Sequence, residues 1–201
     1  MTDKLSHTLS KVVLGCLALY FLYLFTQVIN IVDRRHIGTS NGTYVNSTHE
    51  DKKLYQLANS LTKNCQNRTC QVQLLLNYVT NIPYRTNHFT AHSPQKTIQM
   101  NFGDCDDKSN LLISLLHELK IESYFVLVPK HIFVIVLAKN IHLNSQEKGI
   151  YLNDEKFYIL ESTAKGSTIG FPLHYAINDI HAIIEPFENR KLNITHLEWK
   201  L

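Results

Sequence analysis

The sequence lacks the features that mark several large classes of protein. It has no repeat with a period of about 20 to 50 residues and no low-complexity tract, and its 44% hydrophobic content is that of an ordered globular protein rather than a disordered or collagen-like chain. It also lacks a strong charge excess, because the formal net charge is +3 and basic residues form only short clusters such as Lys52 and Lys53. Nothing resembles the positive stripe of a nucleic-acid-binding protein, so we exclude that class. The 201 residues suffice for about one domain and an additional segment.

Cysteine is scarce, with four residues in the chain. Cys65 and Cys70 stand in CQNRTC, and their separation is not that of a C-x-x-C redox motif, which disfavours a redox function. The pair can form a small disulfide or remain as free thiols. A zinc site with His88 and His92 of HFTAH is a further alternative, but the gaps match no standard zinc module. We therefore expect neither a metal site nor a cofactor.

One long apolar run is present, from Val12 to Val32, and it contains no charge. Its length is about that of a helix that spans a bilayer. A cleaved signal peptide would have a shorter apolar region, and no small-x-small cleavage site precedes Asp33. Residues 1–33 are therefore predicted to form a tail and an uncleaved transmembrane helix that associates with the membrane through residues 12–32.

The side of the membrane is indicated only by secondary features. Lysines before the apolar run are nearly balanced by Arg34 and Arg35 after it, so the positive-inside rule does not decide the orientation. The cysteine pair favours an extracytoplasmic domain. So do four N-x-S/T sequons, although some arise by chance in a chain rich in Asn, Ser and Thr. The sequons begin at Asn41, Asn46, Asn67 and Asn193.

The remainder of the chain is predicted to hold a polar linker, residues 34–50, and one domain, residues 51–201. Apolar spacing predicts helices in DKKLYQLANSLTK and TCQVQLLLNYV, the second ended by Pro83, and a third from Cys105 with a stripe of leucines. Three β-branched and aromatic runs, ESYFVLVP, HIFVIVL and KFYILE, predict strands, with a loop over residues 138–156 before the last. Helices followed by antiparallel strands predict an α+β fold in which the Cys105 helix packs on the sheet.

The stretch NFGDCDDKSNLL sets a thiol among three acids. Asp104, Asp106 and Asp107 should raise the pKa of Cys105 and weaken it as a nucleophile. Two features of a helix start oppose this effect. The unpaired N–H groups and the helix dipole stabilise a thiolate, and successive side chains point in different directions, so we expect the thiol to face the sheet and the acids to face water.

A larger offset is expected from His131, at the start of a predicted strand, because imidazolium beside a thiolate activates a cysteine nucleophile. Glu161, at the end of KFYILE, is placed to orient that imidazole across neighbouring strands. Asp154, in the predicted loop, is an alternative orienting residue. Cys105, His131 and Glu161 thus form a candidate triad for acyl transfer. Asn101, Gln99 and the backbone N–H of Cys105 are candidates to stabilise the oxyanion.

These residues carry a resemblance to a known family. NFGDCDDKSNLLISLLHELKIESYFVLVPKHIFVIV, followed by FYILESTAKGSTIGF, resembles the transglutaminase-like superfamily of cysteine proteases and acyltransferases. In that family a G-D-C at a helix start supplies the nucleophile, a later His opens a strand, and an Asp in a D-P-T-like run completes the triad. Here Gly103 to Cys105 match the first element, His131 the second, and Glu161 to Thr163 stand in the third, with Glu in place of Asp. The resemblance implies a papain-like core.

Two functions follow as hypotheses. The first is a membrane-anchored thiol enzyme that forms a thioester with a peptide or protein substrate, on peptide or glutamine amide bonds. Water would resolve the thioester in a peptidase and an amine in a transglutaminase, and the small domain favours hydrolysis. The second is a non-catalytic, membrane-tethered module that binds a peptide or protein on the same fold. An intact triad favours the enzyme.

Overall fold

The computed structural model describes residues 2–32, 36–39, 42–45, 48, 50–86, 91–143 and 147–201. The chain divides into two compact units, residues 1–36 and 37–201. The first contains α1 (Thr2–Val32), a single helix in which an apolar window from Leu9 to Thr26 has every side chain exposed. It is the one helix in the described residues that is long and apolar enough to cross a membrane.

Two short strands occupy part of the segment predicted to be a polar linker. β1 (His36–Thr39) and β2 (Gly42–Val45) pair in a two-stranded sheet of their own. Both contain β-branched residues, which favour extended pairing. The sequons at Asn41 and Asn46 lie outside the described residues.

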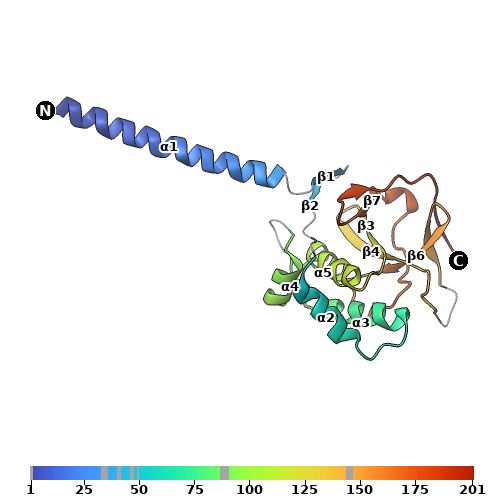
Figure 1. Ribbon diagram of the computed structural model, residues 1–201. Helices are drawn as coiled ribbons and strands as arrows, with labels where there is room; N and C mark the ends of the chain where they lie inside the picture. The colour runs from blue at the N-terminus through green and yellow to red at the C-terminus, as the bar shows by residue number, and fades with distance from the viewer. Residues whose placement is uncertain are drawn as a thin grey trace. The chain divides into compact units, whose positions relative to one another are not determined.

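Four helices gather on one side of the larger sheet (Figure 1). They are α2 (Lys52–Thr62), α3 (Arg68–Asn81), α4 (Pro94–Met100) and α5 (Cys105–Glu118). The apolar spacing correctly predicted α2, α3 and α5. It missed α4, which has seven residues and whose start is set by Ser93 as the N-cap and Pro94 in the first turn.

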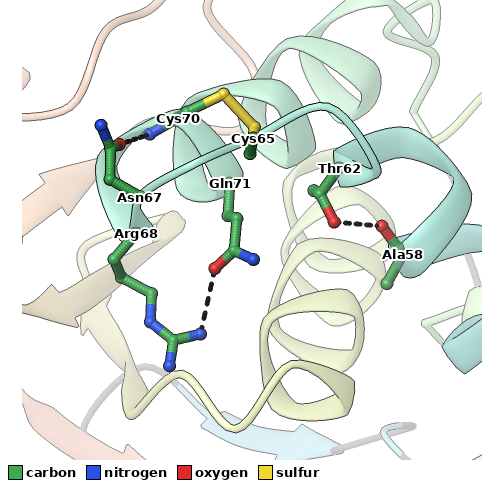
Figure 2. Close-up of a disulfide and its surroundings, with 7 residues drawn as sticks. All are labelled: Ala58, Thr62, Cys65, Asn67, Arg68, Cys70 and Gln71. Carbon is green, nitrogen blue, oxygen red and sulfur yellow. Dashed lines mark hydrogen bonds between the residues drawn. A yellow bond between two sulfur atoms is a disulfide. The ribbon is translucent and has the colours of Figure 1, made fainter.

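A disulfide between Cys65 and Cys70 closes the connection from α2 to α3 (Figure 2). Asn67 caps α3 by accepting a hydrogen bond from the Cys70 N–H at 2.9 Å. Arg68 reaches from the first turn of α3 to the carbonyl of Leu119, 2.9 Å away, at the end of α5. Of the alternatives for the cysteine pair, the structure has the disulfide, which excludes both residues as zinc ligands.

The larger sheet has seven antiparallel strands in the order β8-β7-β3-β4-β6-β5-β9. Its strands are β3 (Ser123–Val128), β4 (His131–Leu137), β5 (Gly149–Leu152), β6 (Glu155–Leu160), β7 (Ala182–Glu185), β8 (Arg190–Lys191) and β9 (Leu197–Lys200). A 3₁₀ turn, η1 (Ile177–Asp179), precedes β7. The predicted loop at 138–156 is wrong in part, because β5 lies within it and forms a hairpin with β6.

Each face of the sheet buries its own apolar cluster. Leu111, Leu112 and Leu115 of α5 pack with Phe125 and Val134 on the helical face. The opposite face holds a second cluster, including Phe133 and Ile159, covered by chain from the C-terminal third of the protein. Because side chains alternate along a strand, successive residues of β4 enter different clusters. Helices on an antiparallel sheet confirm the predicted α+β class.

Candidate active site

Cys105 is the first residue of α5, and local hydrogen bonding fixes the helix start there. Asp104 is the N-cap and accepts from the Asp107 N–H, while Asp107 accepts from the Asp104 N–H, each at 3.3 Å. This capping box satisfies two of the backbone groups that a helix start leaves free. Among the described residues, the N–H groups of Cys105 and Asp106 have no hydrogen-bond partner, so both can donate to an oxyanion that forms beside the thiol.

The capping box also requires a glycine at position 103. A Cβ at this position would lie 2.6 Å from the Cβ of Asp107, closer than such atoms pack. The backbone of Gly103 also bonds the preceding chain, donating to the Pro83 carbonyl at 3.2 Å and accepting from the Arg85 N–H at 3.0 Å. The glycine of GDC therefore allows the turn into α5 to pack against Asp107 and residues 83–85.

Two of the three acids around Cys105 do not face water, so the prediction is wrong for Asp104 and Asp107, while Asp106 is half-buried. Asp107 is fully buried and Asp104 is 9% exposed. The Asp107 carboxylate accepts from the His92 N–H at 2.5 Å and lies 3.2 Å from His92 Nδ1. The reason is tertiary, because residues 91–93 pack over the helix start and bring donors that a solvated carboxylate would not need.

His131 and Glu161 are brought together by the strand register. Antiparallel pairing sets Val134 opposite Leu160, and one further step sets Phe133 opposite Glu161. His131 is then the diagonal neighbour of Glu161 on the same sheet face, within reach of long side chains. His131 Nε2 lies 2.8 Å from Glu161 Oε2. The additional methylene of Glu relative to Asp is therefore accommodated by a diagonal rather than a direct pair.

Thr163 completes the environment of the Glu161 carboxylate. Its N–H and its hydroxyl both donate to Glu161 Oε1, at 2.9 and 2.5 Å. Burial by itself raises the pKa of Glu161, but the hydrogen bonds from His131 and Thr163 outweigh burial and hold the pKa below its ordinary value. Glu161 is thus ionised at neutral pH, with one oxygen aimed at the imidazole.

The thiol lies at the end of the sheet where β4 begins. The backbone of Ile132, next to His131, hydrogen-bonds the Cys105 sulfur. One turn along α5, the Ser109 hydroxyl lies 3.4 Å from the Ile132 carbonyl and 3.1 Å from the Ser162 hydroxyl. These bonds attach the Cys105 helix to the strand of His131 and to the segment of Glu161. Sequence reasoning missed Ser109, whose only signal was a polar residue on a helix face that is otherwise apolar.

The electrostatic environment of Cys105 opposes ionisation. Burial first, and then Asp106 and Asp104, raise the pKa of the thiol to about 12, and the Ile132 hydrogen bond offsets only part of that. The thiol donates to Asp106 Oδ1 at 3.6 Å. Among the described residues it has no hydrogen bond to His131, so the expected offset by imidazolium is absent from this resting arrangement.

Two tyrosines flank the thiol and were not anticipated. The Tyr175 ring stacks on His131 with centroids 6.2 Å apart and planes 18° apart. Burial, followed by the charges of Glu161 and Cys105, raises the pKa of Tyr175. Tyr84 is 56% exposed, and burial followed by the charges of Cys105, Asp104 and Asp106 raises its pKa. They lie 21 residues before and 70 after Cys105 in the sequence, so no local motif could identify them.

The predicted oxyanion side chains are both exposed. Asn101 is the left-handed cap of α4, with a φ of 53°. Gln99 lines a pocket between α2 and α4, together with Leu54 and Ile98. The structure describes no hydrogen bond from either side chain to Cys105, which leaves the N–H groups at the start of α5 as the better placed donors.

The alternative orienting residue and the zinc alternative are both disfavoured. Asp154 lies in the turn before β6, at the opposite end of that strand from Glu161, and is 3.6 Å from His196 rather than beside His131. His92 contacts Asp107, and His88 lies outside the described residues. No group of three or more metal-ligating side chains occurs within the described ranges.

Comparison with known proteins gives a family and several similar structures. A sequence model of the transglutaminase-like superfamily matches residues 55–157, which include Cys105 and His131 and end before Glu161. A proposed cysteine protease from Cytophaga hutchinsonii is 19% identical, with a TM-score of 0.45 over 73% of this chain and 50% of that one. LapG from Legionella pneumophila is 15% identical, with a TM-score of 0.39 over 69% and 86% of the two chains.

The extent of these matches differs. This chain spans half the length of the Cytophaga protein. No curated protein sequence matches it. The family match, by contrast, covers half of the chain and contains the helix start and strand described above. The chain therefore belongs to the transglutaminase-like superfamily.

Proposed function

We propose that the protein is a membrane-anchored cysteine peptidase of transglutaminase-like type, with Cys105, His131 and Glu161 as its catalytic triad. The observation that carries the proposal is the 2.8 Å hydrogen bond between His131, at the start of β4, and Glu161, just after β6, in segments attached to the Cys105 helix. Because His131 Nε2 donates to an ionised carboxylate, Nδ1 is the nitrogen left to accept a proton. That is the tautomer a general base requires.

The reaction proceeds in two steps. The Cys105 thiol gives its proton to His131 Nδ1, and the sulfur attacks the carbonyl carbon of a peptide or glutamine amide. The oxyanion is stabilised by the N–H groups of Cys105 and Asp106. His131 then protonates the leaving amine, which departs and leaves a thioester. Water, deprotonated by His131, hydrolyses the thioester and regenerates the thiol. An amine in place of water would give transamidation.

A cleavage experiment with defined cysteine variants tests the proposal. Cys16 and Cys105 are the free cysteines, so Cys16→Ser in the full-length protein, purified in detergent, leaves Cys105 as the single free thiol. This protein is incubated with a peptide library, and products are identified by mass spectrometry. Cleavage by the Cys16→Ser protein and its absence in Cys16→Ser/Cys105→Ala support the peptidase. Equal cleavage in both would contradict it.

The same preparation separates hydrolysis from amine transfer. A primary amine such as methylamine is added at increasing concentration, and the ratio of methylamide to acid product is measured. We expect the acid to dominate, because Cys105 is only partly buried and Tyr84 near it is exposed, so water can reach the thioester. A methylamide product that dominates at low amine concentration would assign a transglutaminase instead.

One observation favours the second candidate, a non-catalytic module that binds a peptide or protein. The thiol is bonded to Asp106 rather than His131, and its pKa is raised to about 12, so it is protonated at rest. A binding module would retain peptides from the library in both the Cys16→Ser and the Cys16→Ser/Cys105→Ala proteins without cleaving them. Equilibrium binding of library peptides to the two proteins, compared with the cleavage assay, distinguishes the two functions.

We also propose that the peptidase domain is extracytoplasmic and held by residues 12–32. The Cys65–Cys70 disulfide supports this side, since disulfides persist in oxidising compartments. The sequon at Asn193 is in an exposed loop, while Asn67 caps a helix. Protease added to intact cells should digest the domain from outside, and digestion only after lysis would place it in the cytoplasm.

A further inference from the structure

The three acids at the start of α5 differ in how their carboxylates are used. Asp104 and Asp107 satisfy each other's backbone N–H groups, and Asp107 also accepts from the His92 N–H. Asp106 takes no part in these bonds. In the described part of the chain, the hydrogen-bond partner of its carboxylate is the Cys105 thiol, with Sγ and Oδ1 3.6 Å apart. Asp106 is therefore the acid whose carboxylate contacts the candidate nucleophile, while Asp104 acts on it through its charge.

Several charged and titratable groups surround the start of α5. On α5 the neighbours are Asp104, Cys105 and Asp107, and His131 approaches from β4. Tyr84, from the segment before α4, lies within the field of Asp106. The buried Lys108 ammonium is directed to the Thr80 and Ile82 carbonyls, 3.4 and 2.8 Å away. Glu161 is paired with His131, and Tyr175 lies near both Glu161 and Cys105.

Among the described residues, no cationic side chain forms an ion pair with the Asp106 carboxylate. Lys108 is committed to two carbonyls, and His131, the other cationic candidate in this set of neighbours, has its Nε2 bonded to Glu161. Burial, followed by the charge of Asp104, accordingly raises the pKa of Asp106 to about 6. A carboxylate in this condition is stabilised by any positive group that a substrate brings next to it.

We propose that Asp106 holds the Cys105 thiol in its resting, protonated state and makes the site selective for substrates with a positive charge beside the scissile carbonyl. The cationic group, a Lys or Arg side chain or a primary amine, pairs with the Asp106 carboxylate in place of the thiol. The thiol is then free to turn toward His131 and transfer its proton to Nδ1. The inference rests on the proposed role of Cys105 as the nucleophile and names the class of substrate.

Charge-matched thiol reagents test this without a known substrate. Full-length Cys16→Ser protein in detergent is treated at pH 7.5 with methanethiosulfonates that carry an ethylammonium, an ethylsulfonate or a neutral methyl group. The attacking sulfur displaces methanesulfinate and forms a mixed disulfide. We expect the cationic reagent to modify Cys105 at least about tenfold faster than the anionic one, after each rate is divided by that for a small free thiol. A ratio near one would overturn the inference.

The variant Asp106→Asn assigns the effect to this residue. It should reduce the cationic-to-anionic ratio toward one and raise the rate with the neutral reagent about tenfold, since a thiol pKa lower by one unit gives ten times more thiolate. Asp104→Asn is the matched control. It also removes a negative charge near Cys105, and Asn can still cap the helix. The control should change both quantities less. Equal effects of the two variants, or none, would overturn the assignment to Asp106.

The two proposals fail in different ways. If peptides are cleaved at Cys105 without a preference for basic residues and Asp106→Asn leaves the reagent ratio unchanged, this inference is wrong and the peptidase stands. If the ratio falls in Asp106→Asn but no peptide is cleaved, the charge effect stands and the peptidase is wrong. Thermal unfolding of each variant is followed by the fluorescence of Trp199, the single tryptophan. It verifies that every variant in the comparison is folded.

Discussion

Two histidine–carboxylate pairs lie near the Cys105 helix start, and they differ in what the carboxylate does. In His131–Glu161 the ring nitrogen is hydrogen-bonded at 2.8 Å. In His92–Asp107 the ring nitrogen is 3.2 Å away without the alignment of a hydrogen bond, and the carboxylate is instead occupied by backbone N–H groups. The same residue types therefore orient an imidazole at one site and hold backbone at the other.

The origin of the difference is the secondary structure that supplies each carboxylate. Glu161 follows a strand, so its neighbours across the sheet are side chains, and Thr163 satisfies the oxygen that His131 does not use. Asp107 lies in the first turn of a helix, where unpaired N–H groups are the nearest donors. Asp107 is thereby a structural group, whereas Glu161, after a strand end, has an oxygen free to pair with an imidazole.

The largest effect should come from removing each histidine in turn. We expect His131→Ala to reduce kcat/KM for a cleaved library peptide by about 10⁴-fold, as loss of a triad base does. His92→Ala should reduce it less than about tenfold, because His92 contacts a structural carboxylate. Steady-state kinetics on the two variants, with far-ultraviolet circular dichroism to verify folding, make the comparison. Similar losses in both variants would remove the distinction between the pairs.

Removal of the structural carboxylate should have the next largest effect, on stability rather than chemistry. Asp107→Ala leaves the buried N–H groups of His92 and Asp104 without their acceptor, and we expect it to lower the free energy of unfolding by about 3–5 kcal/mol. The comparison variant Glu161→Ala, at the more exposed pair, should lower it by about 1–2 kcal/mol. Urea unfolding monitored by Trp199 fluorescence measures both, and the reverse order would contradict the assignment.

Asp106 belongs to neither pair, and its replacement should stabilise the protein. Its folded-state pKa of about 6 lies above the ordinary 3.8, so the folded state favours the protonated acid and loses stability as the pH rises between these values. At pH 7.5 Asp106→Asn removes the destabilising buried charge, and we expect the free energy of unfolding to increase by about 2–3 kcal/mol. The gain should disappear near pH 4. Unfolding at both pH values tests it, and a gain that is independent of pH would exclude the carboxylate as its cause.

The smallest effect concerns Thr163, whose hydrogen bonds to Glu161 have no counterpart in the His92–Asp107 pair. Thr163→Val removes one hydrogen bond to Glu161, and we expect about a tenfold loss in kcat/KM, equivalent to about 1.4 kcal/mol. The pKa of Glu161 is held below its ordinary value, so the pair stabilises the fold above that value and the contribution is lost as the pH falls through the folded-state pKa. In Thr163→Val the folded-state pKa should lie closer to the ordinary value, so the loss should be smaller and should be complete at a higher pH. Thr163→Ser, which retains the hydroxyl, is the control and should behave as the parent.

Much of the fold followed from local patterns. Apolar spacing predicted α2, α3 and α5, and β-branched runs predicted β3, β4 and β6, because a periodic apolar face identifies an element that must be buried. The short helix α4 and the strands β5, β7, β8 and β9 were not predicted. They have two to seven residues and are stabilised by their neighbours rather than by a pattern of their own.

The sequence by itself determined which reactive residues the chain contains and where each stands in a helix or strand, since Cys105 after Gly-Asp and His131 before an apolar run are local signals. Only the tertiary structure decided how adjacent acids differ. Asp106 and Asp107 are neighbours in the sequence, yet one contacts the thiol and the other is buried beneath residues 91–93. The physical reason is that about 100° of rotation separates successive helical positions, and packing on each side of the helix assigns each carboxylate its partner.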